Sequence, residues 1–423
     1  MPGEIVYRPA DFQPTIDGMR AVGRAFETAG HELFLVGGIV RDTLLGVHGD
    51  AADIDATTSA HPGTIKELLR PFASALWTQG ERFGTIGARI GPFDVEVTTY
   101  RAEDYDPDSR KPEVAFGHDL RTDLARRDFT INAMAVSLVD EQLHDPFGGL
   151  DDLVARRLRT PLDPRVSFSD DPLRMLRAAR FLPRFGLTAD ADLLEAARSL
   201  AARLDIVSRE RVHDELERLL HVAEPRRGLE FLDDVGLLPR VLGFEPAPST
   251  ISASFRLVDA CTVRSRRRIG LLLPHGADTA EGVLRRLRAS TDDRRHTVRS
   301  IALIESLGDR EVSAAGARRL VADARNDLAV VDDVLAIGRL CDNTAVVATA
   351  LRSALDELAV DEPLVPTGPP LDGETIMSTF GIEPGPSVGK AVAFLEQRRI
   401  ELGPLTPEQA VDELRRWGGV GPA

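Results

Sequence analysis

The stretch LVGGIVRDTLLGVHGDAADIDATTSAHP, residues 35–62, decides the expected fold of this chain. It begins as an apolar strand and continues with Gly37 and Gly38. Further on, Asp53 and Asp55 alternate along a second expected strand, so both carboxylates point to the same face. A glycine turn exposes backbone amides to a phosphate, and carboxylate oxygens are ligands that Mg²⁺ prefers. The stretch therefore predicts an α/β unit with a magnesium–nucleotide site.

Length and composition place the chain among globular proteins of several domains. With 423 residues it is too long for one core, so we expect two to four domains. No run approaches the roughly 20 apolar residues of a membrane span, and the N-terminus lacks a basic-then-apolar signal pattern. Two cysteines are too few for a disulfide scaffold. We therefore expect a cytoplasmic protein that contacts no membrane.

The net charge alone does not decide whether the chain binds a nucleic acid. The net charge of −15 opposes phosphate binding, but recognition depends on local charge rather than on the sum. Nearly all basic residues are arginines, and an acidic chain can still carry an arginine-lined groove. The arginines cluster at residues 156–159, 264–268, 285–288 and 294–299.

Periodicity divides the chain into an α/β head and a helical remainder. The head ends near residue 150 and lacks the repeated strand–helix rhythm of a doubly wound domain. Residues 100–120 are polar and rich in turn formers, which predicts a loop. Beyond residue 150 strand signals nearly vanish, and Pro/Gly breaks separate the helical segments. The expected domains are the head at 1–150, a neck at 151–242, a body at 243–362 and a tail at 363–423.

Five ordered motifs between about residues 30 and 240 give the chain a family resemblance. It resembles the class II tRNA nucleotidyltransferase and poly(A) polymerase family, and most of all the bacterial CCA-adding enzymes. The resemblance implies a polymerase-β-like head with a mixed sheet, followed by an all-α neck, body and tail. The motifs are LVGGIVRD with DID, RRDFTINAMA at 126–135, DPFGGLDDL at 145–153, DDPLRMLRAARF at 170–181 and SRERVHDELERLL at 208–220.

The resemblance implies that Asp53 and Asp55 bind two magnesium ions. When a 3′-hydroxyl attacks an α-phosphate, two metals on shared carboxylates lower the pKa of the hydroxyl and neutralise the leaving oxygens. A third carboxylate often completes such a site. Glu96, in the expected strand DVEVTT, is the candidate by pattern, and an ordinary outward-facing strand charge is the alternative.

The same resemblance implies residues that bind the nucleotide. Gly38, through a backbone amide, and Arg41, through its guanidinium fork, would contact the triphosphate. An ordinary helix-start salt bridge is the alternative for Arg41. Arg127 would contact the bound nucleotide, Asp128 would order the ribose side, and Asn132 would support the surrounding shell.

A motif in the neck predicts how a base is chosen. Asp171, Arg174, Arg177 and Arg180 are spaced by three residues, which predicts one stripe along a helix. A carboxylate accepts from an exocyclic amine and a guanidinium donates to ring acceptors, so the pair fits cytosine and adenine. Guanine and uracil reverse this polarity and would leave polar groups unpaired. Asp171 and Arg174 should therefore read the base, while Arg177 and Arg180 hold phosphates or buttress the template. The family commonly has Glu-Asp where this chain has Asp170-Asp171, which puts only a supporting contact in doubt.

The body is expected to lack a hydrolase site. Many bacterial relatives of this kind carry an HD-type metal hydrolase domain after the neck, which needs paired His and Asp ligands. In the corresponding stretch, around residues 266–282, His275 is followed by Gly276, and the body contains no adjacent His-Asp pair. We therefore expect a degenerate HD-like domain. Its arginine clusters at 264–268 and 285–299 either line a tRNA path or form solvated helix faces.

Together these features predict a template-independent RNA nucleotidyltransferase that adds or repairs the 3′-terminal CCA of tRNA. Its cofactor would be Mg²⁺, its partners the tRNA 3′ end, CTP and ATP, with no obligate protein partner evident. A poly(A) polymerase, or an enzyme that adds only CC or only A, is the nearest alternative because it shares the head motifs. A non-catalytic RNA-binding protein is a remote alternative, which the intact Asp53 and Asp55 pair opposes.

Overall fold

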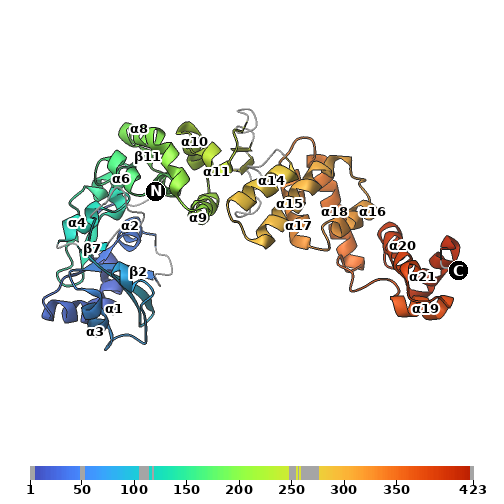
Figure 1. Cartoon of the computed structure of the whole chain (residues 1–423), viewed down its shortest axis with the longest axis horizontal. Helices are drawn as coiled ribbons and strands as arrows, with labels where there is room; N and C mark the ends of the chain where they lie inside the picture. The colour runs from blue at the N-terminus through green and yellow to red at the C-terminus, as the bar shows by residue number, and fades with distance from the viewer. Residues whose placement is uncertain are drawn as a thin grey trace. The chain divides into compact units, whose positions relative to one another are not determined.

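The computed structural model describes residues 5–47, 53–103, 114–116, 119–246, 254–255, 257–258 and 276–419. The chain forms two compact units. The first contains Met1–Ser208 and Arg227–Arg240, and the second contains Arg209–Arg226 and Val241–Ala423. A mixed sheet near the N-terminus followed by helices (Figure 1) confirms the predicted fold class. The finer boundaries at residues 150, 242 and 362 stay predictions.

The head is built on a seven-stranded sheet with the order β3-β4-β5-β2-β1-β8-β9. Strands β2 and β5 are parallel and the other neighbours are antiparallel, so the sheet is mixed. The strands are β1 (Leu33–Val36), β2 (Asp53–Thr58), β3 (Ala75–Trp77), β4 (Thr85–Ile90), β5 (Phe93–Thr99), β8 (Ala135–Ser137) and β9 (Leu143–His144).

The central strands bury one face and leave the other polar. Ile54, Ile86 and Val95 lie on the buried face of β2, β4 and β5 and are almost fully shielded from solvent. Helix α3 (Pro62–Leu69) packs against β4 and β5, and α1 (Pro9–Thr28) packs against α3 and β1. Since alternate residues along a strand point to opposite faces, the polar residues of β2 and β5 gather on the uncovered side.

The predicted arginine cluster at residues 156–159 is used inside the first unit. Asp152 is fully buried and accepts from Nε of Arg157 at 2.7 Å and from Nε of Arg159 at 2.9 Å. Nη1 of Arg156 donates to the carbonyl of Phe185 at 3.0 Å. Arg157 and Arg159 are therefore held by a buried carboxylate within the head, and Arg156 links the head to Phe185 in the helical segment that follows.

The rest of the first unit is mainly helical, with two short ribbons. Within the described part of residues 100–120, the loop prediction is wrong for residues 101–103 and 114–116, which pair as the short ribbon of β6 and β7. The elements are α2 (Gly38–Leu44), α4 (Leu120–Ala125), α5 (Gly149–Val154), α6 (Pro164–Asp170), α7 (Leu173–Phe185), α8 (Ala191–Leu200), α10 (Arg226–Asp234), β6 (Arg101–Glu103), β7 (Val114–Phe116), β10 (Arg157–Leu158) and β11 (Thr188–Ala189), with α11 (Leu238–Leu242) next in sequence.

In the described part of the second unit, helices are joined by turns and irregular segments. Ser290, Ser313, Asp327, Asp372 and Thr406 each cap a helix by accepting a backbone N–H with the side chain, as N-cap residues do. The helices are α9 (Arg209–Leu220), α14 (Ala277–Arg286), α15 (Thr291–Glu305), α16 (Ala314–Asp323), α17 (Leu328–Gly338), α18 (Ala345–Asp361), α19 (Gly373–Phe380), α20 (Pro386–Leu402) and α21 (Pro407–Trp417).

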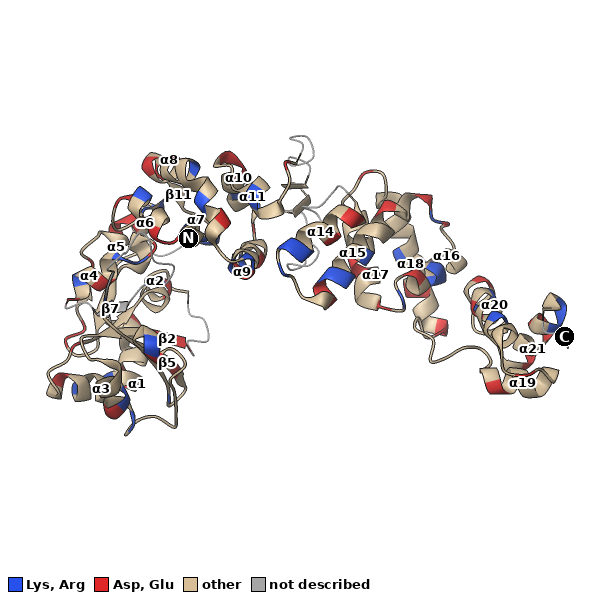
Figure 2. Ribbon diagram, in the orientation of Figure 1, with Lys and Arg blue, Asp and Glu red and all other residues tan. Residues whose placement is uncertain are grey.

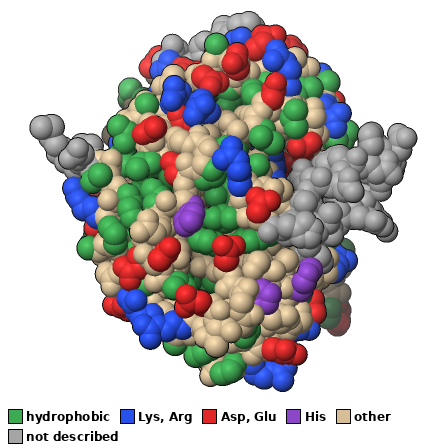
Figure 3. Space-filling view, turned by 90° about the vertical axis from the view of Figure 1, so that its left-hand side faces the viewer, with side chains coloured by type: hydrophobic (Ala, Val, Ile, Leu, Met, Phe, Trp, Pro, Cys, Tyr) green, Lys and Arg blue, Asp and Glu red, His purple; other side chains and the backbone are tan. Residues whose placement is uncertain are grey.

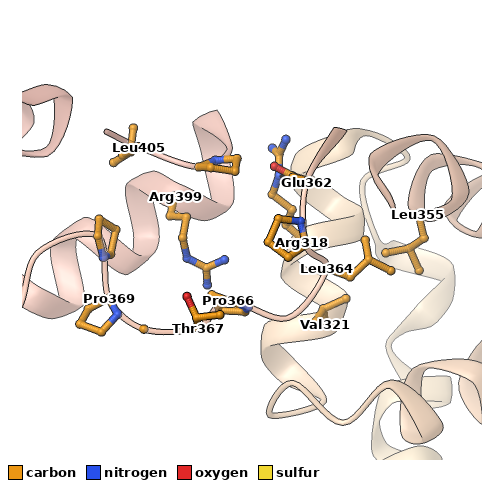
Figure 4. Close-up of a pocket in the computed structure, with 14 residues that line it drawn as sticks. Arg318, Val321, Leu355, Glu362, Leu364, Pro366, Thr367, Pro369, Arg399 and Leu405 are labelled. Atoms are coloured by element: carbon orange, nitrogen blue, oxygen red, sulfur yellow. Dashed lines mark hydrogen bonds and ion pairs between the residues drawn. The ribbon is translucent and has the colours of Figure 1, made fainter. Parts of the chain in front are cut away.

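The described helices of this unit enclose apolar cores and border a cavity. Leu320, Val334 and Leu351 belong to the first core, and Leu395 and Leu414 belong to the second. A cavity of about 240 Å³ lies beside the proline-rich segment at 363–370 (Figure 4). An ion pair of Arg318 with Glu362 lines it, at 2.7 Å between Nε and Oε1.

Charges of both signs are interspersed along the described chain (Figure 2). Arg285 and Arg294, from the cluster predicted at 285–299, both contact Glu281, at 3.1 and 2.9 Å. The cluster at 264–268 and His275 lie outside the described residues. Among the helices that the structure describes, none is long and apolar enough to cross a membrane.

Candidate active site

Asp53 and Asp55 lie on the uncovered face of the sheet, on either side of the buried Ile54. Strand β2 runs parallel to β5, with Asp53 opposite Asp94 and Asp55 opposite Glu96. Paired residues on neighbouring strands point to the same face, so four carboxylates share one surface. The alternation of β2 was predictable. The register that brings Glu96 beside Asp55 was not, because it depends on pairing with a distant strand.

The charge on this surface is only partly compensated. Burial and the charges of Asp55 and Asp53 raise the pKa of Glu96. Asp55 is exposed as a residue, but its carboxyl group is crowded by protein atoms, and this desolvation raises its pKa against the opposing charge of Arg127. The charge of Asp53 adds to the rise. Asp94 differs, because Nε of Arg89 donates to its Oδ1 at 2.6 Å. A bound cation would relieve the repulsion among the other three carboxylates.

Gly37 opens a gap beside the carboxylates. Its φ of 73° lies in the left-handed region that favours glycine. A Cβ atom at this position would lie 3.2 Å from Nη1 of Arg127 and 3.9 Å from Oδ2 of Asp55. Any side chain at residue 37 would therefore intrude between the guanidinium and the carboxylate. Gly38 follows directly and begins helix α2.

Arg127 faces this gap with part of its guanidinium unused. Its Nη2 donates to Oδ2 of Asp123 at 3.1 Å. Its Nε is buried and has no hydrogen-bond partner within the described part of the chain. This geometry agrees with the predicted contact to a nucleotide, which stays a prediction.

Arg41 lies in a more closed environment. It is 5% exposed, its Nε donates to Oδ1 of Asp42 at 2.8 Å, and its Nη1 donates to Oδ1 of Asn132. Its guanidinium carbon lies 4.3 Å from the ring centroid of Phe185 and 5.4 Å from that of Phe181. Burial lowers the pKa of Arg41, against the opposing charge of Asp42. The salt bridge weighed as an alternative is present, and contact with a triphosphate stays a prediction.

The aromatic pair around Arg41 was missed in the sequence. Phe181 and Phe185 are four residues apart on α7, so their spacing placed them on one face of a helix. Nothing in the sequence indicated that this face would meet Arg41.

Asp128 and Asn132 join the head to helix α7. Asp128 is 8% exposed, and its Oδ1 accepts from Nδ2 of Asn132 at 2.8 Å. Its Oδ2 accepts from Nε of Arg177, also at 2.8 Å. Burial by itself would raise the pKa of Asp128. The charge of Arg177 and the hydrogen bonds outweigh it, so the pKa is lowered.

The prediction that four neck residues share one helix is wrong for Asp171. Helix α6 ends at Asp170, and Asp171 has an extended backbone with φ −136° and ψ 99°. Pro172 follows, and a proline disfavours the helical conformation of the residue before it. Helix α7 begins at Leu173, whose backbone N–H donates to Oδ1 of Asp171 at 3.2 Å. Asp171 therefore lies at the turn between two helices.

Arg174, Arg177 and Arg180 do share α7, in different surroundings. Nη1 of Arg174 donates to Oγ of Ser167 at 2.8 Å, and its Nη2 donates to the carbonyl of Arg126. Arg180 is 5% exposed, with its guanidinium carbon 4.4 Å from the ring centroid of Phe181. Of the two roles predicted for Arg180, its burial favours the buttress.

The donor chemistry of the carboxylate surface fits magnesium. Within the ranges covered by the structure, no three His, Cys, Asp or Glu side chains form a metal-binding group. Mg²⁺ commonly takes one or two protein carboxylates and completes its shell with water and substrate phosphates. Asp53 and Asp55, both exposed on one face, supply that number of carboxylates.

An exposed carboxylate pair beside a glycine turn, on a mixed sheet, is an arrangement suited to nucleotidyl transfer, and comparison with known proteins agrees with it. The family model described as the poly A polymerase head domain matches residues 33–159. A second model, described as the probable RNA and SrmB-binding site of polymerase A, matches residues 186–253.

The described surface of the head carries no side-chain type alone. Figure 3 shows this side of the molecule, where side chains of both charges are mixed with apolar ones.

Some relatives match this chain over nearly its whole length. A CCA-adding enzyme of Limosilactobacillus fermentum is 31% identical over 397 residues, which cover 93% of this chain and 94% of the relative. The chain therefore belongs to the family of CCA-adding enzymes. Enzymes of this family use a divalent metal ion.

Other relatives match over a shorter length. The CCA-adding enzyme of Limosilactobacillus reuteri is 37% identical over 246 residues, and the match spans 58% of each chain. A CC-adding tRNA nucleotidyltransferase of Shouchella clausii is 36% identical over 57% of this chain and 58% of that protein.

A solved structure shows the same fold. The CCA-adding enzyme of Bacillus stearothermophilus, in complex with CTP, superposes with a TM-score of 0.76. It is 23% identical, and the match covers 98% of each chain.

Proposed function

We propose that this protein adds or repairs the 3′-terminal CCA of tRNA, with CTP and ATP as nucleotide donors. The observation that carries the proposal is the shared face of β2 and β5. There Asp53 and Asp55 lie opposite Asp94 and Glu96, and Asp55 lies next to the gap at Gly37. We assign Mg²⁺ to this face, with Asp53 and Asp55 as ligands and Glu96 beside them as a further negative charge. When bound, Mg²⁺ supplies hydroxyl activation and neutralises charge on the leaving pyrophosphate.

The residues around the gap position the nucleotide. We assign the phosphates to the glycine turn, because Gly37 lies beside Nη1 of the incompletely paired Arg127 and Gly38 lies beside Nη2 of Arg41. Arg41 supports this side from behind by fixing Asn132 and, through it, Asp128. Arg41 itself would contact the triphosphate through the guanidinium N–H groups that do not bond Asp42 or Asn132.

The turn before α7 selects the base. Asp171 accepts from the exocyclic amine of cytosine or adenine, and Arg174 donates to the ring acceptors. Arg177 positions this helix against the head through Asp128, and Arg180 buttresses it from inside. A cytoplasmic location and the lack of an obligate protein partner remain predictions.

Separate incorporation of each nucleotide tests the proposal. tRNA transcripts that end at the discriminator base, after C and after CC are incubated with each labelled NTP in turn. CTP addition to the first two and ATP addition to the third are expected. CC addition without A, A addition alone, or long A tails would instead identify a partial enzyme or a poly(A) polymerase. Binding without incorporation would indicate the non-catalytic alternative.

A further inference from the structure

Trp77 ends the edge strand β3 and covers a glycine on the active face. It is paired with Gly87 of β4. A Cβ atom at Gly87 would lie 1.8 Å from Nε1 and 2.2 Å from Cε2 of Trp77, so the indole rests directly on the bare backbone. The side chain is half-buried and makes no hydrogen bond or ring contact with any part of the chain that the structure describes.

The indole lies in line with the catalytic carboxylates. Gly87 is paired with Glu96, and Glu96 is paired with Asp55. Paired residues point to one face, so Trp77, the Gly87 position, Glu96 and Asp55 form one row across four strands. Neighbouring strands are about 4.8 Å apart, which puts the indole over β4 about 10 Å from the strand of Asp55.

Trp77 and the glycine turn lie on opposite sides of the carboxylates. The strand order runs β3-β4-β5-β2-β1, so the carboxylates lie between Trp77 and the glycine turn that follows β1. We assigned the triphosphate to that turn. In an in-line displacement the attacking hydroxyl and the leaving pyrophosphate are on opposite sides of the α-phosphate. With the triphosphate at the glycine turn, this geometry would bring the RNA end to the carboxylates from the side of Trp77.

We propose that Trp77 is the stacking platform for the 3′-terminal base of the RNA that receives the nucleotide. This inference rests on the proposed function and names the residue that holds the acceptor. Aromatic side chains stack on every base because each has a π-face. Such tolerance suits a site whose terminal base is first the discriminator, then C, then C again. The competing interpretation is that Trp77 only shields Gly87.

Fluorescence distinguishes the two interpretations, because the chain has two tryptophans. Trp417 lies in the second unit, with its ring centroid 4.7 Å from that of Phe394. A Trp417→Phe variant leaves Trp77 as the emitter, and the matched Trp77→Phe variant leaves Trp417. Titration with a tRNA transcript ending in CC should quench Trp417→Phe saturably and leave Trp77→Phe nearly unchanged. Equal quenching in both, or no quenching of Trp417→Phe while a gel shift shows binding, overturns the proposal.

Kinetics supply a second readout. Trp77→Ala should raise the KM for the tRNA acceptor by at least about 5-fold, as expected when one stacked base is lost, and leave the KM for CTP unchanged. Trp77→Phe should recover part of the loss. Gly87→Ala should reproduce it, because the added methyl displaces the indole. Thermal unfolding of each variant checks that the fold is retained.

The outcomes separate this inference from the proposed function. If the parent chain adds neither C nor A to any tRNA transcript, the proposed function fails. If the parent adds both and Trp77→Ala keeps the parental KM for tRNA, the stacking platform alone is wrong. Equal increases in the KM for tRNA and for CTP also overturn it, because they indicate a general distortion of the sheet.

Discussion

Arg177 binds one oxygen of Asp128 with two nitrogens, Nε at 2.8 Å and Nη2 at 2.7 Å. The other oxygen of Asp128 bonds Asn132, which in turn bonds Arg41. One buried carboxylate thus links helix α7, which carries the proposed base template, to the proposed phosphate side. If the two sides hold one nucleotide, as proposed, this link would set the distance between the base and the phosphates.

The lowered pKa of Asp128 predicts a dependence of stability on pH. An Asp whose pKa is depressed on folding contributes stability above its unfolded value of about 3.9 and loses it as pH falls through the folded value. We expect the free energy of unfolding of the first unit to fall as pH drops below about 4. Asp128→Asn should flatten this dependence. Urea unfolding between pH 3 and 6 measures it, and an unchanged pH profile in Asp128→Asn contradicts the assignment.

Removal of the partner tests the same link at neutral pH. Arg177→Ala leaves the buried carboxylate of Asp128 with fewer donors, so we expect a loss of about 1–3 kcal/mol in stability. A double variant, Asp128→Asn with Arg177→Ala, should recover part of that loss because no buried charge remains. If the double variant loses as much as the sum of the two single variants, the residues do not act as a pair.

The predictions from sequence agree with the structure where the alternation of side chains along one strand is sufficient to place a residue. Asp53 and Asp55 share a face because strand side chains alternate, and this needs no knowledge of other strands. The place of Glu96 depended on the parallel pairing of β2 with β5, which local pattern does not encode. For Asp171 the decisive signal was present, since Pro172 prevents a continuous helix. A spacing of three residues predicts one helix face only where no proline interrupts the helix.

Asp53→Ala or Asp55→Ala should reduce nucleotide incorporation below about one percent while cooperative unfolding is retained. Each change removes a carboxylate that activates the hydroxyl and neutralises the leaving group through the metal. Asp94 is the matched control, because it lies on the same face and is neutralised by Arg89. Asp94→Asn should stay within a few-fold of the parent. Substantial activity in either β2 variant at saturating Mg²⁺ shows that other carboxylates bind the metal.

Arg41→Ala and Arg127→Ala should differ in their effects on stability and on the KM for CTP. Arg41→Ala removes a buried guanidinium bonded to Asn132 and packed on Phe185, so a loss of about 2 kcal/mol or more is expected. Arg127→Ala should change stability less and raise the KM for CTP. Chemical denaturation and steady-state kinetics on both variants provide the comparison. A purely structural Arg127 would show the reverse, with lowered stability and an unchanged KM.

The second unit should show no metal-dependent hydrolysis. In the described part of the body, His296 bonds Asp333 at 2.5 Å, both nearly buried, and they belong to no metal-binding group of three. We expect no turnover of 2′,3′-cyclic nucleotides or p-nitrophenyl phosphate with Ni²⁺ or Mn²⁺. Hydrolysis that survives Asp53→Ala would refute the degenerate HD-like body.

Asp171 should control which bases are accepted rather than only how fast they are added. Without its carboxylate nothing accepts from the exocyclic amine of C or A, and nothing opposes the O4 of U or the O6 of G. One bidentate recognition pair contributes about 1–3 kcal/mol of discrimination, a factor of about 5 to 150. In Asp171→Ala, kcat/KM for UTP or GTP relative to CTP should therefore rise at least several-fold on one tRNA transcript.

The asparagine variant sharpens this test. Asp171 also accepts the backbone N–H of Leu173 at the start of α7, so alanine removes a helix contact as well as a base contact. Asn keeps an acceptor for that N–H and offers an amide donor that matches O4 of U. Asp171→Asn should therefore relax discrimination toward UTP while α7 remains as stable as in the parent. If both variants lose CTP and ATP use yet reject UTP and GTP as strictly as the parent, base selection lies elsewhere, such as in the RNA end.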